Sequence, residues 1–521
     1  MCRGVSILLI AASCAASATA DWPVYSGDAA RNAIPVADRV GVRSALWRLT
    51  HDQLGRPIEF FTASGPVTDG HRVFTVGLID NIEHLVCADA ATGQLLWTAE
   101  APFVVSDSWS APAIDSANGV VLFGADRSVV AYDLADGSVV WETVLQNDIV
   151  NASPLVTDDR PGENRVFITD YDPFFAQGRL YAINADPFDA AANPYDPGEI
   201  VWSAVLGRTS GASPAYAGGR VFVATTGLGG IEPGRVFAFD ADQPGGAAQP
   251  AWVFINTINR GFFGGVSVSE DAGGLAVFAA SYAFSGSRFS ANLVKLHAET
   301  GSLRWSVPSN RTSSVPLALG DGRVLLSTGL AGFGTTPSLQ MFEDRGAGAV
   351  LLWDSAVETW NDANNNGVID PGEYTPLGGW TQRPLVIRAD DGLFAFVGVI
   401  STGGSEVGAY PTMRTVDLGR RPGEAGFFWD TYEGGGNSPA IGGGRIYTVG
   451  AQGLVAFDAA ARSPFDVNGD GVVDLEDLYA WVAGEGERDV NRDGTVDQRD
   501  HDAIVAEIRR DEERLMREPQ R

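Results

Sequence analysis

The sequence predicts an all-β fold, an eight-bladed β-propeller closed by its N-terminal strand, followed by a small α-helical module at the C-terminus. Three observations predict this fold. Eight tryptophans end eight similar segments, strands and prolines recur before most of them, and 63 of the 521 residues are glycine, as tight hairpins require. A propeller blade is built from about four short strands, which matches the length of one repeat. The eight residues are Trp47, Trp97, Trp141, Trp202, Trp252, Trp305, Trp353 and Trp429.

Residues 1–20 are predicted to be a signal peptide. Arg3 precedes an apolar run, and Ala18-Thr19-Ala20 fits the small-x-small cleavage pattern, so the mature chain is expected to begin at Asp21. The apolar run is too short to span a bilayer, and no membrane span is expected. The protein is therefore expected to be secreted, periplasmic or at the cell surface. Lipid attachment at Cys14 remains an alternative.

The charge and the cysteines narrow the possible functions. The formal net charge is −29, so phosphates repel the chain and no nucleic-acid partner is expected, whereas a calcium ion is compatible. Of the cysteines Cys2, Cys14 and Cys87, only the last follows the signal segment, so the mature chain can form no internal disulfide. Cys87 occupies a small-residue position of a repeat, which indicates a buried structural thiol.

The repeat unit is clearest in the segments that end at Trp97, Trp141 and Trp305. A strand is followed by an acidic residue and then by a glycine that can take positive φ in the hairpin. The next strand ends in tryptophan, whose large ring is expected to fill the space between neighbouring sheets. Shorter strands come before each unit, for example at residues 120–123, 220–224 and 323–327.

Ring closure is also predicted. The last repeat, residues 438–458, ends without its tryptophan, whereas Trp47 has no strands before it. The simplest interpretation is that the N-terminal strand completes the eighth blade of a propeller over residues 21–463, which removes exposed sheet edges. An open solenoid or two separate β domains remain the alternatives.

The pattern Ala-x-Asp-x-x-Thr-Gly-x-x-x-Trp resembles the tryptophan-docking motif of pyrroloquinoline quinone (PQQ) propellers, over residues 22 to about 463. This family includes quinoprotein alcohol dehydrogenases and non-enzymatic relatives such as the lipoprotein propeller of outer-membrane assembly. The resemblance therefore implies the fold more firmly than the function. The repeats that end at Trp202, Trp252, Trp353 and Trp429 depart from the pattern through insertions rich in Gly, Pro and Asp.

Three segments match the twelve-residue EF-hand calcium loop: residues 362–373, 466–477 and 489–500. Side chains at positions 1, 3 and 5 supply oxygens, a glycine at position 6 permits the bend, position 7 supplies its carbonyl, and position 12 supplies a carboxylate. Position 9 coordinates directly or through water. The predicted ligands are Asp362, Asn364, Asn366, Val368, Asp370 and Glu373 in the inserted loop, Asp466, Asn468, Asp470, Val472, Asp474 and Asp477 in the next, and Asp489, Asn491, Asp493, Thr495, Asp497 and Asp500 in the last.

Position 8 is apolar in all three loops (Val473, Val496 and Ile369), and this side chain is expected to pack each loop against a hydrophobic core. The alternative is a set of turns without a bound ion.

The terminal pair of loops, within residues 464–510, resembles a type I dockerin. That resemblance implies calcium binding and docking to a cohesin-like or cell-surface protein. The positions that contact cohesin in that family are Leu475-Glu476 and Gln498-Arg499 here, and they differ between the two copies. Residues 511–521 are expected to form a charged tail.

The favoured function is an exported, calcium-binding, non-catalytic binding or scaffold protein. A polysaccharide or a protein is the expected ligand of a propeller rim, where Phe174, Phe175, Phe284, Phe289 and Tyr410 are candidate contacts. The equal alternative is that these aromatic side chains only pack the hairpins down. One alternative is a PQQ-dependent dehydrogenase. Enzymes of that class typically hold a vicinal disulfide over the quinone, and this sequence has no adjacent cysteines, so PQQ and a catalytic residue are not expected. A component of extracellular polysaccharide degradation is the other alternative.

Overall fold

The computed structural model describes most of the chain. The described residues are 21–36, 45–61, 64–104, 108–172, 174–227, 232–243, 245–258, 260–271, 273–282, 289–329, 335–389, 392–400, 410–458, 465, 467, 473–484, 488–490 and 495–517. The predicted signal peptide lies outside them.

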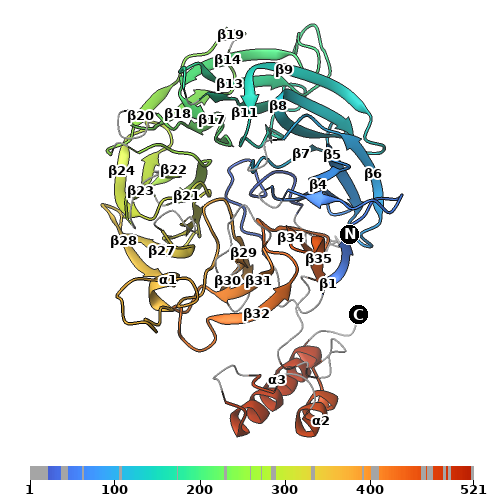
Figure 1. The fold of residues 1–521 in the computed structure, drawn as a ribbon, viewed down its shortest axis with the longest axis vertical. Helices are drawn as coiled ribbons and strands as arrows, with labels where there is room; N and C mark the ends of the chain where they lie inside the picture. The colour runs from blue at the N-terminus through green and yellow to red at the C-terminus, as the bar shows by residue number, and fades with distance from the viewer. Residues whose placement is uncertain are drawn as a thin grey trace, which may run out of the picture.

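Eight antiparallel sheets form a ring of blades (Figure 1). Blade 1 contains β2 (Glu59–Phe60), β3 (Val67–Thr68), β4 (Arg72–Ile79), β5 (Ile82–Asp89) and β6 (Leu95–Glu100), and blade 2 contains β7 (Ala113–Asp115), β8 (Val120–Asp133) and β9 (Val139–Ile149). Blade 3 contains β10 (Leu155–Val156), β11 (Arg165–Thr169), β13 (Gly178–Asn184), β14 (Ile200–Gly207) and the parallel strand β19 (Gly246–Ala247). Blade 4 contains β16 (Ala215–Ala217), β17 (Arg220–Ala224), β18 (Arg235–Asp240) and β20 (Trp252–Ile255).

In blades 5 to 8 the strands again follow one another from the inner to the outer side of the blade. Blade 5 contains β21 (Ser267–Asp271), β22 (Gly274–Ala280), β23 (Ala291–His297) and β24 (Leu303–Ser309), and blade 6 contains β25 (Leu317–Ala318), β26 (Arg323–Thr328), β27 (Ser338–Asp344) and β28 (Ala349–Asp354). Blade 7 contains β29 (Leu385–Ala389), β30 (Gly392–Val399), β31 (Thr412–Asp417) and β32 (Phe428–Glu433). Blade 8 contains β33 (Ala440–Gly442), β34 (Arg445–Gly450), β35 (Gly453–Asp458) and β1 (Ala45–Leu49). A separate short pair joins β12 (Tyr171–Asp172) to β15 (Thr209–Ser210).

The ring is closed by the N-terminal strand, as predicted. Strand β1 pairs antiparallel with β35, so Trp47 lies opposite Ala456 and Leu49 lies opposite Leu454. Blade 8 thus takes its outer strand from the start of the chain and its other strands from the end. This pairing rules out the open solenoid.

The tryptophans join neighbouring blades, again as predicted. The indole N–H of Trp47 donates to the carbonyl of Ala90, 3.1 Å away in the next blade, and Trp97 donates to Leu134 at 3.2 Å. Trp202 and Trp252 make the same contact with Ala241 and Ala298, at 3.2 and 2.8 Å. The rings of Trp47, Trp97 and Trp252 lie against the hairpin glycines Gly93, Gly137 and Gly301 of the next blade.

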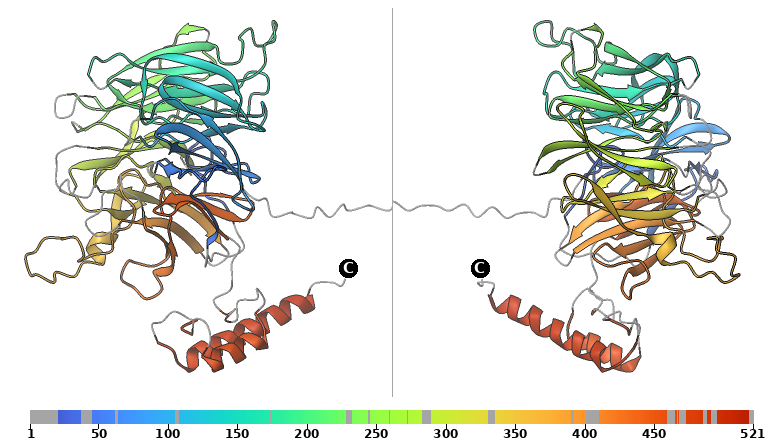
Figure 2. Two further views of the ribbon diagram at one scale, coloured as in Figure 1. Left: turned by 45° about the vertical axis from the view of Figure 1, so that its right-hand side comes forward. Right: turned by 90° about the vertical axis from the view of Figure 1, so that its left-hand side faces the viewer.

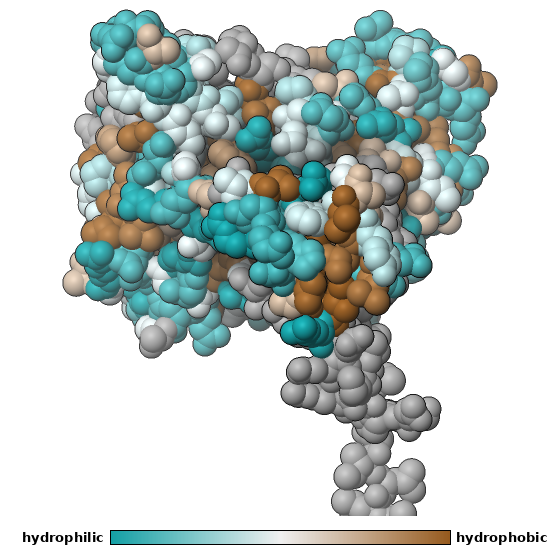
Figure 3. All heavy atoms as spheres, turned by 90° about the horizontal axis from the view of Figure 1, so that it is seen from below, coloured by the Kyte–Doolittle hydropathy of each residue, from teal (hydrophilic) through white to brown (hydrophobic). Residues whose placement is uncertain are grey.

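The cores lie between adjacent blades. One cluster combines Leu180 and Trp202 of blade 3 with Val223 and Phe239 of blade 4. Cys87 is fully buried in the cluster between blades 1 and 2, and burial raises the pKa of its thiol to about 12. The prediction of a structural thiol is therefore confirmed. The side of the protein in Figure 3 is largely hydrophilic with smaller apolar areas.

A helical unit follows the ring (Figure 2). Helix α2 (Leu475–Ala483) begins at Asp474, whose carboxylate caps the first turn, and ends at Gly484 with φ of 82°. Helix α3 (Gln498–Arg517) packs against it, and the small core contains Val467, Val473, Val490, Ile504 and Ile508. A third, short helix, α1 (Ser355–Glu358), lies in the insertion between β28 and β29. Among the described helices, none is long and apolar enough to cross a membrane.

Candidate functional site

The inserted loop at residues 362–373 is the best-described candidate metal site. It follows α1 and projects from the ring, where it appears in gold in Figure 2. The amides of Asn366 and Gly367 donate to the two carboxylate oxygens of Asp362, at 3.0 Å each. Gly367 makes the bend with φ of 73°, a conformation that costs a glycine little.

The last residue of the loop also turns inward. The two carboxylate oxygens of Glu373 accept from the amides of Asn364 and Asp370, at 3.3 and 3.4 Å. One of these oxygens also accepts from the indole N–H of Trp360, at 3.2 Å. The acidic residues at the two ends of the loop therefore face its interior.

Asp370 lies between two asparagine side chains. The amide nitrogens of Asn364 and Asn366 donate to its Oδ2, at 2.9 and 2.7 Å. These two bonds lower the pKa of Asp370 from its ordinary value, so this carboxylate is charged at neutral pH. Together with the carbonyl of Val368, these groups form a set of hard oxygens, the kind that calcium prefers.

The carboxylates of this loop do not by themselves supply enough ligands for a calcium ion. Within the described parts of the chain, His, Cys, Asp and Glu side chains nowhere gather in groups of three that could hold a metal. A calcium ion in this loop would also need the amide oxygens of Asn364 and Asn366. Rotation of an amide exchanges its nitrogen for its oxygen, so both residues can supply one.

The two terminal loops are described only in part. Asp466, Asn468, Asp470, Val472, Asn491 and Asp493 lie outside the described residues, whereas Asp489 and Thr495 lie within them. The position 12 carboxylates of Asp477 and Asp500 are fully buried. They accept from the amides of Asp474 and Asp497 at 2.9 and 2.8 Å. The same contact joins Asp370 to Glu373, so all three loops share one local geometry between positions 9 and 12.

The apolar position 8 behaves differently in the two terminal loops. Val473 packs into the small core, but Val496 is 50% exposed, so the prediction for the second loop was wrong. Position 2 contributes instead, because Val467 and Val490 are both buried in that core. Ile504 fills the core from α3, which leaves Val496 outside it.

One mouth of the ring is filled by the chain itself, which the sequence analysis missed. Residues 22–36, here called the strap, cross the centre of the ring in dark blue in Figure 1. The strap carbonyls of Trp22, Pro23 and Ala29 accept from amides of β3, β7 and β16. Neither periodicity nor repeat similarity marks this segment, and its partners are far away in sequence.

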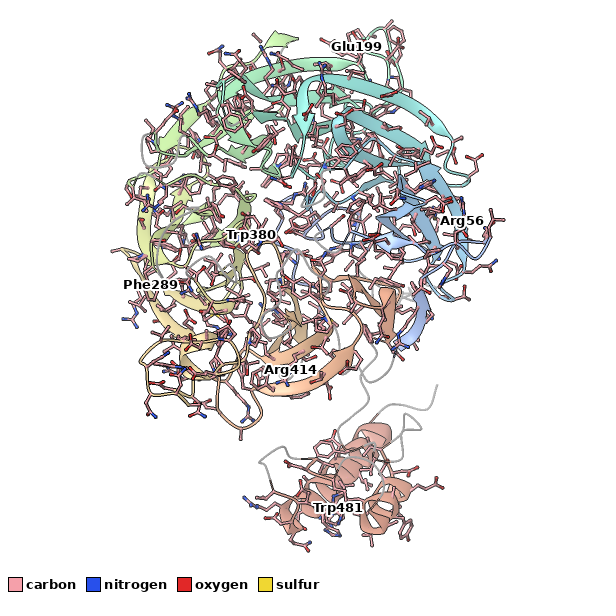
Figure 4. The ribbon with its side chains drawn as sticks, viewed as in Figure 1. Arg56, Glu199, Phe289, Trp380, Arg414 and Trp481 are labelled. Carbon is pink, nitrogen blue, oxygen red and sulfur yellow. The ribbon has the colours of Figure 1, made fainter. Side chains whose placement is uncertain are left out.

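The ring axis also holds an aromatic cluster. The rings of Trp109 and Trp380 meet edge to face, 5.2 Å apart, and Tyr282 lies 5.4 Å from Trp380. Trp109 precedes blade 2, Trp380 precedes blade 7, and Tyr282 follows β22 of blade 5. All three side chains are buried. Figure 4 shows Trp380 at the inner side of the ring, whereas Arg56 and Glu199 lie at its outer edge. Residues from widely separated blades therefore touch across the axis.

The candidate rim contacts divide into two groups. Phe174 and Phe175 are 71% and 82% exposed, and the carboxylate of Asp172 orders their turn by accepting from both amides, at 3.0 and 2.8 Å. Tyr410, by contrast, is buried, which agrees with the alternative that it packs its hairpin and not with a contact at the rim. Its ring lies beside Gly398 and its Cβ beside Gly436. Phe284 lies outside the described residues.

Comparison with known proteins identifies the type of fold. The family described as outer membrane protein assembly factor BamB matches residues 40–186. No curated protein matches the chain in sequence. A europium-containing methanol dehydrogenase is similar in structure, with a TM-score of 0.55 and 12% identity over 83% of this chain and 90% of that one. The quinohemoprotein alcohol dehydrogenase of Comamonas testosteroni has a TM-score of 0.53 and 14% identity, over 88% of this chain and 86% of that one.

The ring of sheets thus defines an eight-bladed β-propeller. The family model is similar to residues 40–186, and the two dehydrogenases are similar to the chain in fold. At these identities the similarity concerns the fold alone.

Proposed function

We propose that the protein is an exported, calcium-binding propeller that acts as a non-catalytic binding or scaffold protein. The observation that supports calcium binding is the inserted loop, in which Asp362, Asp370 and Glu373 are oriented by backbone and amide hydrogen bonds. A scaffold role is supported by the ring axis, which the strap and the aromatic cluster occupy, so that the rims remain for binding.

The terminal helical unit is proposed to hold two further calcium ions. The side chains of Asp477 and Asp500 are buried. A bound cation would offset the free-energy cost of burying their carboxylate charges. Its proposed partner is a cohesin-like or cell-surface protein, and a polysaccharide or protein is the proposed ligand of the rim at Phe174 and Phe175.

Calorimetric titration with calcium tests the proposal. The wild-type protein is expected to bind three ions, with dissociation constants on the order of 10⁻⁴ to 10⁻³ M if the loops resemble other extracellular modules. The variant Glu373→Gln should lose one ion, and the double variant Asp477→Asn with Asp500→Asn should lose the other two. Asp148→Asn, an exposed residue outside the loops, is the matched control and should bind all three. Titration without saturable heat would refute calcium binding.

A quinoprotein dehydrogenase is the second candidate, because two proteins of similar fold carry dehydrogenase names. The residues present do not fit a quinone site of that type. The mature chain has no adjacent cysteines, and Cys87 is buried between blades 1 and 2. Incubation with PQQ and calcium, followed by dye reduction with alcohols, should show no activity; substrate-dependent reduction would favour the enzyme.

A further inference from the structure

The strap is anchored by a buried arginine. Arg31 is fully buried, and its guanidinium donates to four carbonyl oxygens. Nε donates to Pro214 at 2.9 Å, Nη1 to Tyr25 at 2.6 Å, and Nη2 to both Ser153 and Pro154, at 3.1 and 3.0 Å. The segments that precede blades 3 and 4 supply three of these carbonyls, and Tyr25 of the strap supplies the fourth. Together they form a carbonyl cage that matches the planar fork of a guanidinium.

The other residues of the strap contact blades 1, 2 and 4 to 8. The amides of Thr68, Ile114, Tyr216, Val268 and Arg388 donate to strap carbonyls, at 2.7 to 3.0 Å, from blades 1, 2, 4, 5 and 7. The side chain of Asn32 pairs with both backbone groups of Ala318 in blade 6, at 3.0 and 2.9 Å. Trp22 packs against Ala440 and Ile441 of blade 8.

The backbone of the strap is held in an uncommon conformation. Ser26 and Arg31 have φ of 68° and 58°, which disfavours any residue with a Cβ. Strain of this kind persists only where the surroundings impose it. Turns within the strap accompany these φ values, because the amides of Gly27 and Arg31 donate to the carbonyls of Val24 and Asp28, at 2.8 and 3.0 Å. The mouth of the ring therefore holds a turned segment in one conformation.

We propose that the mouth of the ring is a binding site for a turn-containing, arginine-bearing peptide segment, and that the chain fills this site itself with residues 22–36. The strap is an internal ligand whose Arg31 occupies the carbonyl cage. The proposal is independent of calcium and of the terminal unit.

A peptide added in trans tests the site. The double variant Arg31→Ala with Asn32→Ala weakens the internal ligand, because it removes four hydrogen bonds at the cage and two at blade 6. A fluorescent peptide of residues 22–36 should bind this variant saturably. It should bind the wild type at least about tenfold more weakly, because the occupied mouth is rarely available.

Two controls accompany this measurement. The same peptide with alanine in place of its arginine should bind the variant at least about tenfold more weakly. The protein variant Arg56→Ala removes an exposed arginine at the outer edge of the ring (Figure 4) and should behave as wild type. No binding to the double variant, equal binding to the wild type, or equal binding of the alanine peptide would overturn the proposal.

Hydrogen exchange of the wild type decides the matter if the double variant does not fold. The amides of Thr68, Ile114, Tyr216, Val268 and Arg388 lie in five blades but share one ligand. They should exchange through one common opening, with the same free energy, when the strap leaves as a unit. Five unrelated opening free energies would contradict the proposal.

Discussion

At the scale of single residues, glycine and tryptophan form a pair that links the blades. Gly93, Gly137 and Gly301 have φ of 72°, 76° and 69°, and each lies under the tryptophan of the preceding blade. The glycine is therefore needed twice, once for the positive φ and once for the missing Cβ. The hairpin that needs positive φ is local to a few residues, and the glycine and the tryptophan recur in each repeat, so the motif could be recognised from the sequence.

Replacing Gly137 with alanine is expected to destabilise the ring. A Cβ there would lie 2.6 Å from the ring of Trp97, so the indole must shift, at a cost of about 2–4 kcal/mol in the free energy of unfolding. Gly119→Ala is the matched control, because Gly119 has φ of 69° in the same blade with nothing within 4 Å of the added Cβ. That control should cost only about 1 kcal/mol. Chemical denaturation of both variants measures the difference, and equal losses would contradict the role of the contact.

A second prediction concerns a buried amine. Lys295 is paired with Asp271 in its own blade and with Asp344 in the next, and its side chain is 5% exposed. Lys295→Met should lower the free energy of unfolding by about 3 kcal/mol, because both carboxylates lose their counter-charge. Arg345→Met breaks an exposed pair with Glu343 and should cost at most about 1 kcal/mol. Thermal melts compare the two, and a Lys295 variant as stable as the control would contradict the prediction.

At the scale of elements, the inserted loop is a segment whose sequence matches the EF-hand pattern. Its register of acids, asparagines and glycine is a short-range pattern, so candidate ligands could be nominated from the sequence. The contact between Trp360 and Glu373 joins two residues thirteen positions apart and was not anticipated. This contact depends on the direction in which the chain leaves α1 and enters the loop.

Because of this contact, we expect Trp360 to report calcium binding at the proposed site. An ion bound by Glu373 should weaken the hydrogen bond from the indole, and the tryptophan fluorescence should change with calcium concentration. Trp360→Phe should remove that part of the signal without abolishing binding measured by calorimetry. Trp481→Phe, in the terminal unit, should retain it. Fluorescence changes that persist unaltered in the Trp360 variant would contradict the proposed geometry.

At the scale of the whole molecule, a cysteine and several tyrosine side chains are buried with their ionisable protons in place. Burial raises the pKa of Cys87, Tyr216 and Tyr447 to about 12, above their ordinary values of 9.0 and 10.0. Above the ordinary values the unfolded chain loses these protons, while the folded chain keeps them up to about pH 12. Stability must then fall as the pH rises through this interval, because the folded state binds more protons.

The expected result is a melting temperature that declines steadily from about pH 9 upward, with the full contribution present at lower pH. Thermal melts at constant ionic strength measure this decline, and the ultraviolet absorbance of tyrosinate should appear together with unfolding. An unchanged melting temperature up to pH 11 would contradict it.

Sequence alone determined the number of blades and the closing role of residues 45–49, because both depend on a repeated sequence pattern. A short-range pattern also nominated the three EF-hand-like loops, whose calcium binding stays a prediction. Only the tertiary structure decided what fills the centre. Arg31, Asn32 and Trp380 meet partners that are many residues away and belong to no repeat. Such contacts form only once the eight sheets stand in a ring and bring the ends of their inner strands to one axis.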